Sequence, residues 1–171
     1  FPTRRSSDLV FIMSEQIENQ NGHEQATQDE SSSVARCLTF ESGGLTLFLS
    51  TEYVIEIINA YYITPLPLVP SFIKGIINLR GQILPVVDIR MCMGKPEMEY
   101  TNKTCIVVLN VDTIPLGFVV DSVRQVVDIN LQQVRPIPVK RQQKLLDGMV
   151  TTEDGDVLMS FDCRALATYQ Y

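Results

Sequence analysis

The sequence predicts an all-β protein whose short antiparallel strands close into two small barrels. From Cys37 onward, short runs rich in Val, Ile and Leu alternate with turns at Gly, Asp or Asn, a pattern typical of such strands. The runs number about nine or ten, and one flat sheet of that size would leave long unpaired edges. Closure removes these edges, and 171 residues suffice for two small barrels.

The first expected element is a hairpin with strands over residues 38–41 and 45–49, joined at Ser42-Gly43-Gly44. Ser50 can then cap a helical turn, with Glu52 near the positive end of its dipole. Residues 54–58 fit a helix or a strand equally well by periodicity, so both assignments stay open.

The central part of the chain combines a connector with a second hairpin. Three prolines in residues 64–70 forbid regular ladder pairing and predict an extended segment. Residues 71–74 are expected to form one helical turn, with Gly75 as its C-cap. Two apolar strands then meet at Gly81-Gln82, since glycine supplies the positive φ that tight hairpins need.

Arg80 ends the first of these two strands and is the one charge that interrupts the apolar pattern there. A guanidinium is costly to bury, so we expect this side chain at the surface. It could dock a partner through a carboxylate or a backbone carbonyl. The alternative is a surface salt bridge of small net value, conceivably to Glu56.

The C-terminal half continues the strand pattern. Strands are expected over residues 103–111, 116–121, 123–129, 145–152 and 157–162, with a second proline connector at 135–138 and a final helix at 163–168.

Three apolar runs end in aspartate, at Asp88, Asp121 and Asp162. Two such carboxylates brought together could share a proton or bind a hard cation. Asp88 and Asp162 each precede a short helical segment, however, and can accept hydrogen bonds from its first amides. Helix capping is therefore the favoured interpretation of these two residues.

The residues needed for catalysis are missing from the part expected to be ordered. His23, the only histidine, lies in a polar segment, and no phosphate-binding glycine motif occurs. The four cysteines lack CxxC spacing and are expected to be buried free thiols; they are Cys37, Cys92, Cys105 and Cys163. We therefore predict no enzyme activity, no catalytic residues, no cofactor and no metal site.

Charge and hydropathy limit the partners and the location. The formal net charge of −6 owes much to acidic residues in segment 14–33, which has no Lys or Arg, so the remainder is nearly neutral. A body without a basic stripe argues against nucleic acid and favours a protein partner. No apolar run approaches the roughly 20 residues of a membrane span, so we expect no direct membrane insertion and a cytoplasmic location.

The chain is expected to have three parts. Residues 1–12 do not match the rest in character and look like a non-native leader, with Met13 as the natural start. Residues 13–35 form an acidic segment that has little to bury and is expected to be disordered. Residues 36–171 form the folded domain.

Three segments carry a resemblance to a known family. They are ITPLP at 63–67, FIKGIINLRG at 72–81 and GFVVDSV at 117–123. In this order they resemble CheW-like proteins, the adaptors of bacterial chemotaxis. The resemblance extends from about Leu38 to Leu166, nearly the whole part expected to be ordered.

The resemblance implies two five-stranded β-barrel subdomains around a shared hydrophobic seam, without catalytic activity. It implies a scaffold that couples two partners, the cytoplasmic tip of methyl-accepting chemoreceptors and the regulatory domain of the chemotaxis histidine kinase. The protein would then act in the cytoplasm at membrane-bound receptor arrays. A CheW-like adaptor of a pilus-motility pathway is one alternative. A generic peptide-binding barrel is another, disfavoured by the absence of Trp and of a clustered aromatic groove.

The resemblance also implies site residues. The receptor-binding set is Val54, Glu56, Gly75 and Arg80, and positions near other partner-binding surfaces are Val123 and Val126. Glu56 and Arg80 would orient a partner through charge-assisted hydrogen bonds, whereas Val54 would add apolar contact area.

Overall fold

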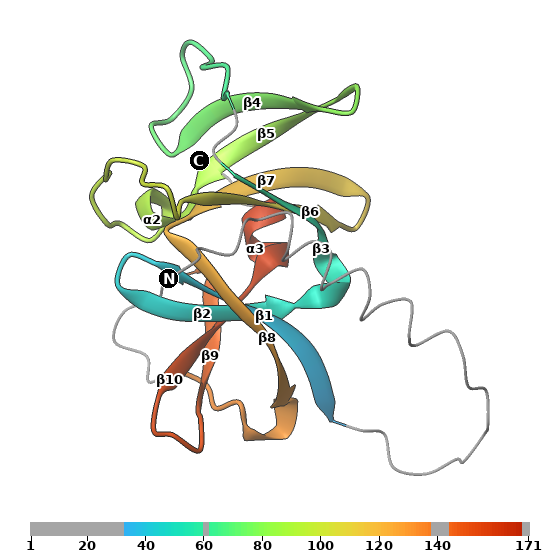
Figure 1. The fold of residues 1–171 in the computed structure, drawn as a ribbon, viewed down its shortest axis with the longest axis vertical. Coiled ribbons are helices and arrows are strands. Elements are labelled where there is room, and N and C mark those ends of the chain that lie inside the picture. The colour runs from blue at the N-terminus through green and yellow to red at the C-terminus, as the bar shows by residue number, and fades with distance from the viewer. Residues whose placement is uncertain (1–32, 60–61, 138–143, 169–171) are drawn as a thin grey trace, which may run out of the picture.

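The computed structural model describes residues 33–59, 62–137 and 144–168. The expected leader at 1–12, all but the end of the expected acidic segment at 13–35, and His23 lie outside these residues. The described part is mostly β, with ten strands in two five-stranded sheets (Figure 1).

The first sheet has the strand order β8-β1-β2-β10-β9. Its strands are β1 Val34–Ser42, β2 Leu45–Ser50, β8 Ser122–Asn130, β9 Leu146–Thr151 and β10 Val157–Phe161. Strand β10 runs parallel to β2, and the other pairs are antiparallel. The predicted hairpin around Ser42-Gly43-Gly44 is confirmed as β1–β2.

The second sheet has the strand order β3-β6-β7-β5-β4. Its strands are β3 Val54–Asn59, β4 Ile73–Leu79, β5 Gln82–Asp88, β6 Cys105–Val111 and β7 Ile114–Val120. Strand β5 runs parallel to β7, and the other pairs are antiparallel. The open choice for residues 54–58 is thereby decided in favour of a strand.

Short helices follow four strands of the described chain, and three of them begin at the predicted N-caps Ser50, Asp88 and Asp162. They are the 3-10 turns η1 Thr51–Tyr53 and η2 Leu131–Gln133 and the α-helices α2 Ile89–Cys92 and α3 Cys163–Ala167. The Asp88 carboxylate accepts from the Arg90 amide at 3.0 Å, and that of Asp162 accepts from Ala165 at 3.0 Å. Capping by both aspartates is therefore confirmed.

The main hydrophobic core lies between the sheets and draws on both. At its centre the rings of Phe40, Phe118 and Phe161 lie 5.3 to 5.8 Å apart, centroid to centroid. Phe40 and Phe161 come from the first sheet and Phe118 from the second, so aromatic packing joins the sheets. A smaller apolar cluster belongs to each sheet alone.

The expected closure of each sheet into a barrel is wrong. Among the described residues, no ladder joins β8 to β9 or β3 to β4, which are the outer strands. Proline connectors take positions on two of these edges instead: Thr64 pairs with Ile76 of β4, and Arg135 with Met149 of β9. Each pairing stops at once because Pro65 and Pro136 follow and have no amide hydrogen to donate.

Two local predictions also fail. The helical turn expected at residues 71–74 is not formed, since β4 already begins at Ile73. Gly75 is therefore not a C-cap; it lies at a bulge inside β4 with φ of +140°. The hairpin tip is Arg80-Gly81 rather than Gly81-Gln82, because Leu79 pairs with Gln82.

Candidate functional site

Arg80 occupies the tip of the β4–β5 hairpin. The φ angles are +53° at Arg80 and +86° at Gly81, as a two-residue hairpin turn with right-handed strand twist requires. The left-handed conformation costs an L-residue about 1 kcal/mol. The turn is supported by the Gly81 amide, which donates to Asn78 Oδ1 at 2.9 Å. This geometry leaves the Arg80 side chain 79% exposed, as expected from the sequence.

Glu56 lies on β3 and is largely buried, with its side chain 15% exposed. It faces Val108 across the β3–β6 ladder, and directly paired residues share a face of the sheet. Val108 belongs to the apolar cluster of the second sheet, so the carboxylate sits at the margin of that cluster. Its Oε1 accepts a hydrogen bond from Arg80 Nη2 at 3.2 Å, while Oε2 is buried without a partner among the described residues.

The ion pair of Arg80 and Glu56 connects the two outer strands of the second sheet. Strand β3 carries Glu56 at one edge, and the hairpin that holds Arg80 includes β4 at the other edge. The pair therefore spans the side of the sheet that no ladder closes. A salt bridge to Glu56 was one of the two expectations for Arg80, and the structure forms it. Its role in docking stays a prediction.

Of the other two predicted receptor-binding residues, Gly75 is buried and Val54 keeps part of its surface exposed. A Cβ at Gly75 would lie 2.0 Å from the Thr64 carbonyl oxygen, so only glycine allows the connector to pair there. Val54 is half-buried against the main core. Two apolar residues that sequence reasoning missed are exposed instead: Ile55, at the bulge of β3, and Ile83, on β5 near the hairpin tip, at 52% and 64%.

Val123 and Val126 lie on β8 of the first sheet and pack against the main core. Their pairing partners on β1 are Phe40 and Leu38, both buried. The structure does not bring these valines together with Glu56 and Arg80, which belong to the other sheet. Both valines are only partly buried, and their role in partner binding stays a prediction.

A second polar cluster, not anticipated from the sequence, joins the two sheets. Arg90 of α2 is buried and forms an ion pair with Asp121, which lies between β7 and β8. The Asp121 carboxylate also accepts from the Gly43 amide at 2.9 Å, and its own amide donates to the Glu41 carbonyl at 2.8 Å. One carboxylate thus ties α2 of the second sheet to the β1–β2 turn of the first.

Glu41 extends this cluster through an ion pair with Arg124 and by accepting the Ser122 hydroxyl at 2.9 Å. Burial by itself raises the pKa of the Glu41 carboxyl, but the hydrogen bonds from Arg124 and Ser122 outweigh it and leave the pKa below its ordinary value. The carboxylate therefore stays ionised when these contacts are made.

The thiols are poorly suited to chemistry. Burial raises the pKa of Cys37, Cys92 and Cys163 to about 11, so all three stay protonated at neutral pH. Within residues 33–59, 62–137 and 144–168, no three His, Cys, Asp or Glu side chains are grouped to hold a metal ion. None of the helices in the described part is long and apolar enough to cross a membrane.

Comparison with known proteins identifies the fold. The family model described as the CheW-like domain matches residues 36–170. The chemotaxis protein CheW of Klebsiella aerogenes is 37% identical over 93 residues, which are 51% of this chain and 56% of that protein. The CheW of Thermotoga maritima is 33% identical over 126 residues, covering 73% of this chain and 82% of the relative.

A solved structure agrees with these matches. The crystal structure of the scaffolding protein TtCheW from Thermoanaerobacter tengcongensis is similar with a TM-score of 0.70 at 26% identity, over 75% of this chain and 88% of that one. The chain spans only about half the length of some curated relatives that it matches, at 56% and 48%.

Proposed function

Because this chain belongs to the CheW-like domain family, we propose that it is a non-enzymatic scaffold that couples chemoreceptors to the chemotaxis histidine kinase. The observation that carries the proposal is the family match, which covers nearly all the described residues from the first sheet to the last helix. Its relatives carry the names chemotaxis protein and scaffolding protein. Residues 36–171 would contain the whole coupling function, acting in the cytoplasm at receptor arrays.

The receptor partner would be the helical cytoplasmic tip of a methyl-accepting chemoreceptor, and its contact would centre on Arg80. The geometry that supports this is an exposed guanidinium that donates a hydrogen bond to a largely buried carboxylate. A planar donor of this kind suits a carboxylate or the free carbonyls at a helix end. Exposed Ile83 on the same hairpin would add apolar contact area.

The second partner would be the regulatory domain of the chemotaxis histidine kinase, bound at the same time as the receptor. The packed positions of Val123 and Val126 favour an indirect role, in which they hold β8 in place. Gly75 acts in the same indirect way, by letting the Thr64 connector cover β4.

The test is a pull-down of the purified chain with a receptor-tip helical hairpin and with the isolated kinase regulatory domain, separately and together. The scaffold proposal expects a ternary complex. A proline-rich peptide serves as the control for a generic peptide-binding module. Binding of that peptide without either chemotaxis partner would contradict the proposal.

A further inference from the structure

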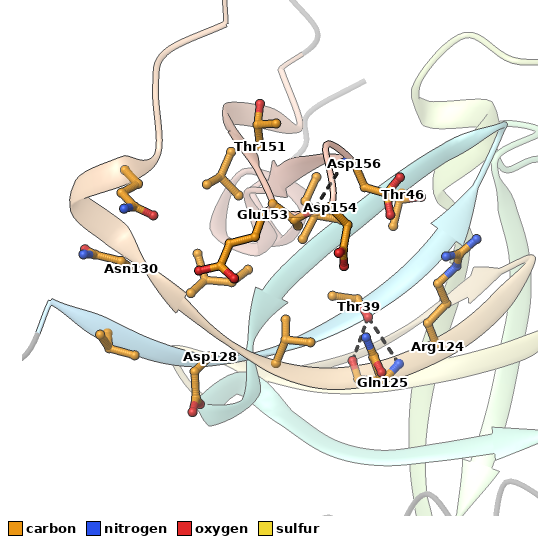
Figure 2. Close-up of a pocket in the computed structure, with 17 residues that line it drawn as sticks. Thr39, Thr46, Arg124, Gln125, Asp128, Asn130, Thr151, Glu153, Asp154 and Asp156 are labelled. Carbon is orange, nitrogen blue, oxygen red and sulfur yellow. Dashed lines mark hydrogen bonds between the residues drawn. The ribbon is translucent and has the colours of Figure 1, made fainter.

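A groove of about 560 Å³ lies on the open side of the first sheet, apart from Arg80 and Glu56. Strand β8 forms one wall, and the turn between β9 and β10 forms the other (Figure 2). The groove therefore occupies the gap between the two outer strands of that sheet, where a closed barrel would have a ladder.

The floor of the groove is apolar. It includes Ile129, Val150 and Leu158, which belong to the small cluster of the first sheet. The buried polar group beside them, the Thr39 hydroxyl, is already satisfied: it donates to the Gln125 carbonyl at 2.7 Å and accepts from the Gln125 amide at 3.2 Å. This floor favours an aliphatic side chain.

The wall formed by the β9–β10 turn is acidic. Glu153, Asp154 and Asp156 all line the groove, and Figure 2 shows the side chains of Glu153 and Asp154 reaching from the turn toward β8. The turn is held by the Asp156 amide, which donates to Thr152 Oγ1 at 3.1 Å, and by the Thr152 amide, which donates to the Asp156 carbonyl at 2.8 Å. The carboxylates are thus presented on an ordered support.

Within the part of the chain that the structure describes, no cation is paired with this wall. Arg124 is the one basic residue among the described groove residues, and it is paired with Glu41. Arg36 pairs with Asp128 of β8 at 3.6 Å. Arg135 and Glu153 both line an adjoining cavity. Among the described residues, no ion pair involves the three carboxylates of the turn.

The remaining wall is the outer edge of β8, along which no other described strand pairs. Strand β8 is outermost in its sheet and pairs only with β1. The outer edge of β9 is partly occupied by the proline connector, because Arg135 pairs with Met149 there. An extended chain can therefore add to β8, in the manner of peptides that join an open sheet edge.

We propose that this groove binds an extended segment of a partner protein in which Lys or Arg alternates with aliphatic residues. Side chains of a strand alternate between its two faces, so the aliphatic set would meet Ile129, Val150 and Leu158 and the cationic set would meet the acidic turn. A second copy of this chain does not supply such a segment in its residues 14–33, which carry acids and no Lys or Arg. This site is separate from the receptor contact proposed above.

The experiment is fluorescence anisotropy of the full chain with a short labelled peptide of alternating Lys and Val. We expect saturable binding that a Glu-Val peptide and a Lys-Ser peptide do not reproduce. The double variant Glu153→Gln/Asp154→Asn should weaken binding about fivefold or more, as expected for two rim ion pairs. Its matched control, Glu99→Gln/Asp147→Asn, removes the same charge from exposed positions outside the groove and should leave affinity unchanged.

Amide chemical shifts measured during the titration locate the bound peptide. The proposal expects changes along β8 and at residues 150–156. It is overturned by the absence of saturable binding, by equal binding of the Lys-Ser peptide, by equal weakening in the two double variants, or by shifts concentrated at the Arg80 hairpin. Circular dichroism of each variant excludes loss of folding as the cause.

Discussion

In both sheets the neighbouring strands pair, from one edge to the other, as antiparallel, antiparallel, parallel and antiparallel. In both, a residue that precedes a proline pairs with the last strand: Thr64 with Ile76, and Arg135 with Met149. The two sheets are thus built on one plan. Because the backbone arrangement is shared, different side chains at corresponding positions indicate different roles of the two sheets.

The hairpins that correspond in this plan carry opposite charges. The β4–β5 tip presents Arg80, whereas the β9–β10 turn presents Glu153, Asp154 and Asp156. One arrangement thus offers a cationic surface on the second sheet and an anionic groove on the first. Two surfaces of opposite charge can therefore be presented on the same strand order.

The largest expected effect compares two glycines that precede the paired residues Ile76 and Met149. A Cβ at Gly75 would meet a backbone oxygen at 2.0 Å at positive φ, whereas one at Gly148 would meet the Val134 side chain at 2.5 Å. Gly75→Ala should cost about 3 kcal/mol of unfolding free energy, and Gly148→Ala about half of that, since a side chain can move. Urea unfolding measures both, and equal losses would contradict the comparison.

The second comparison concerns the arginines that follow the two capping aspartates by two residues. Arg90 is buried with Asp121, whereas Arg164 is exposed and lies over the Tyr53 ring at 5.9 Å. Arg90→Ala should lower the unfolding free energy by about 2 kcal/mol, because it leaves a half-buried carboxylate without its cation. Arg164→Ala should leave stability nearly unchanged. Similar stability of the two variants would show that the sheets are not tied through Asp121.

The third prediction concerns function at the cationic tip. Arg80→Ala should fold normally and weaken receptor-dependent kinase activation, since truncation of an interface arginine can cost about 2 kcal/mol of binding. Glu56→Ala should act in the same direction, and the double variant should be less than additive if the two form one site. Kinase activation is measured beside circular dichroism.

Arg80→Gly sharpens this test, because glycine suits the positive φ at that position and should keep the hairpin while removing the guanidinium. Arg164→Ala is the control for loss of an exposed arginine. Normal activation by Arg80→Gly would assign Arg80 a purely structural role.

The smallest expected effect is a dependence of the unfolding free energy on pH, which should be similar for a cysteine of either sheet. Burial raises the pKa of Cys37 from 9.0 to about 11, so the folded chain holds this proton where the unfolded chain loses it. The stability that the folded state gains by keeping the Cys37 thiol protonated is complete below pH 9 and is lost as the pH rises toward 11. Cys37→Ala should reduce the loss of stability at high pH. Cys105→Ala, in the other sheet, should also reduce it, since burial raises the pKa of Cys105. Unchanged pH profiles of unfolding in both variants would contradict it.

The predictions that succeeded depend on chain neighbours. The β1–β2 hairpin and the caps at Ser50, Asp88 and Asp162 each need only residues a few positions away, and all are confirmed. The exposure of Arg80 also follows locally, from one charge beside a turn. Its pairing with Glu56 was one of two alternatives, because a sequence shows that two charges exist but not that their strands approach each other.

Apart from the one-residue shift of the β4–β5 turn, most failures involve partners distant in sequence. Gly75 was interpreted as a helix cap because nothing local reveals Thr64 packed against it. The Arg90–Asp121 pair was missed for the same reason. Ile55 was missed because a bulge, which depends on pairing with β6, turns it outward. Ile83 could have been found, since alternation along a strand places it on the face opposite Leu84 and Val86.

By itself, the sequence determined that the chain is mostly β, where most strands and turns lie, and which family it resembles, because alternation of apolar and turn residues acts over short distances. Tertiary structure alone decided that the sheets stay open, which hairpins correspond, and which charges meet. Those outcomes depend on long-range pairing, in which a proline connector ends a ladder or a buried arginine finds its carboxylate only after both sheets have packed on the shared core.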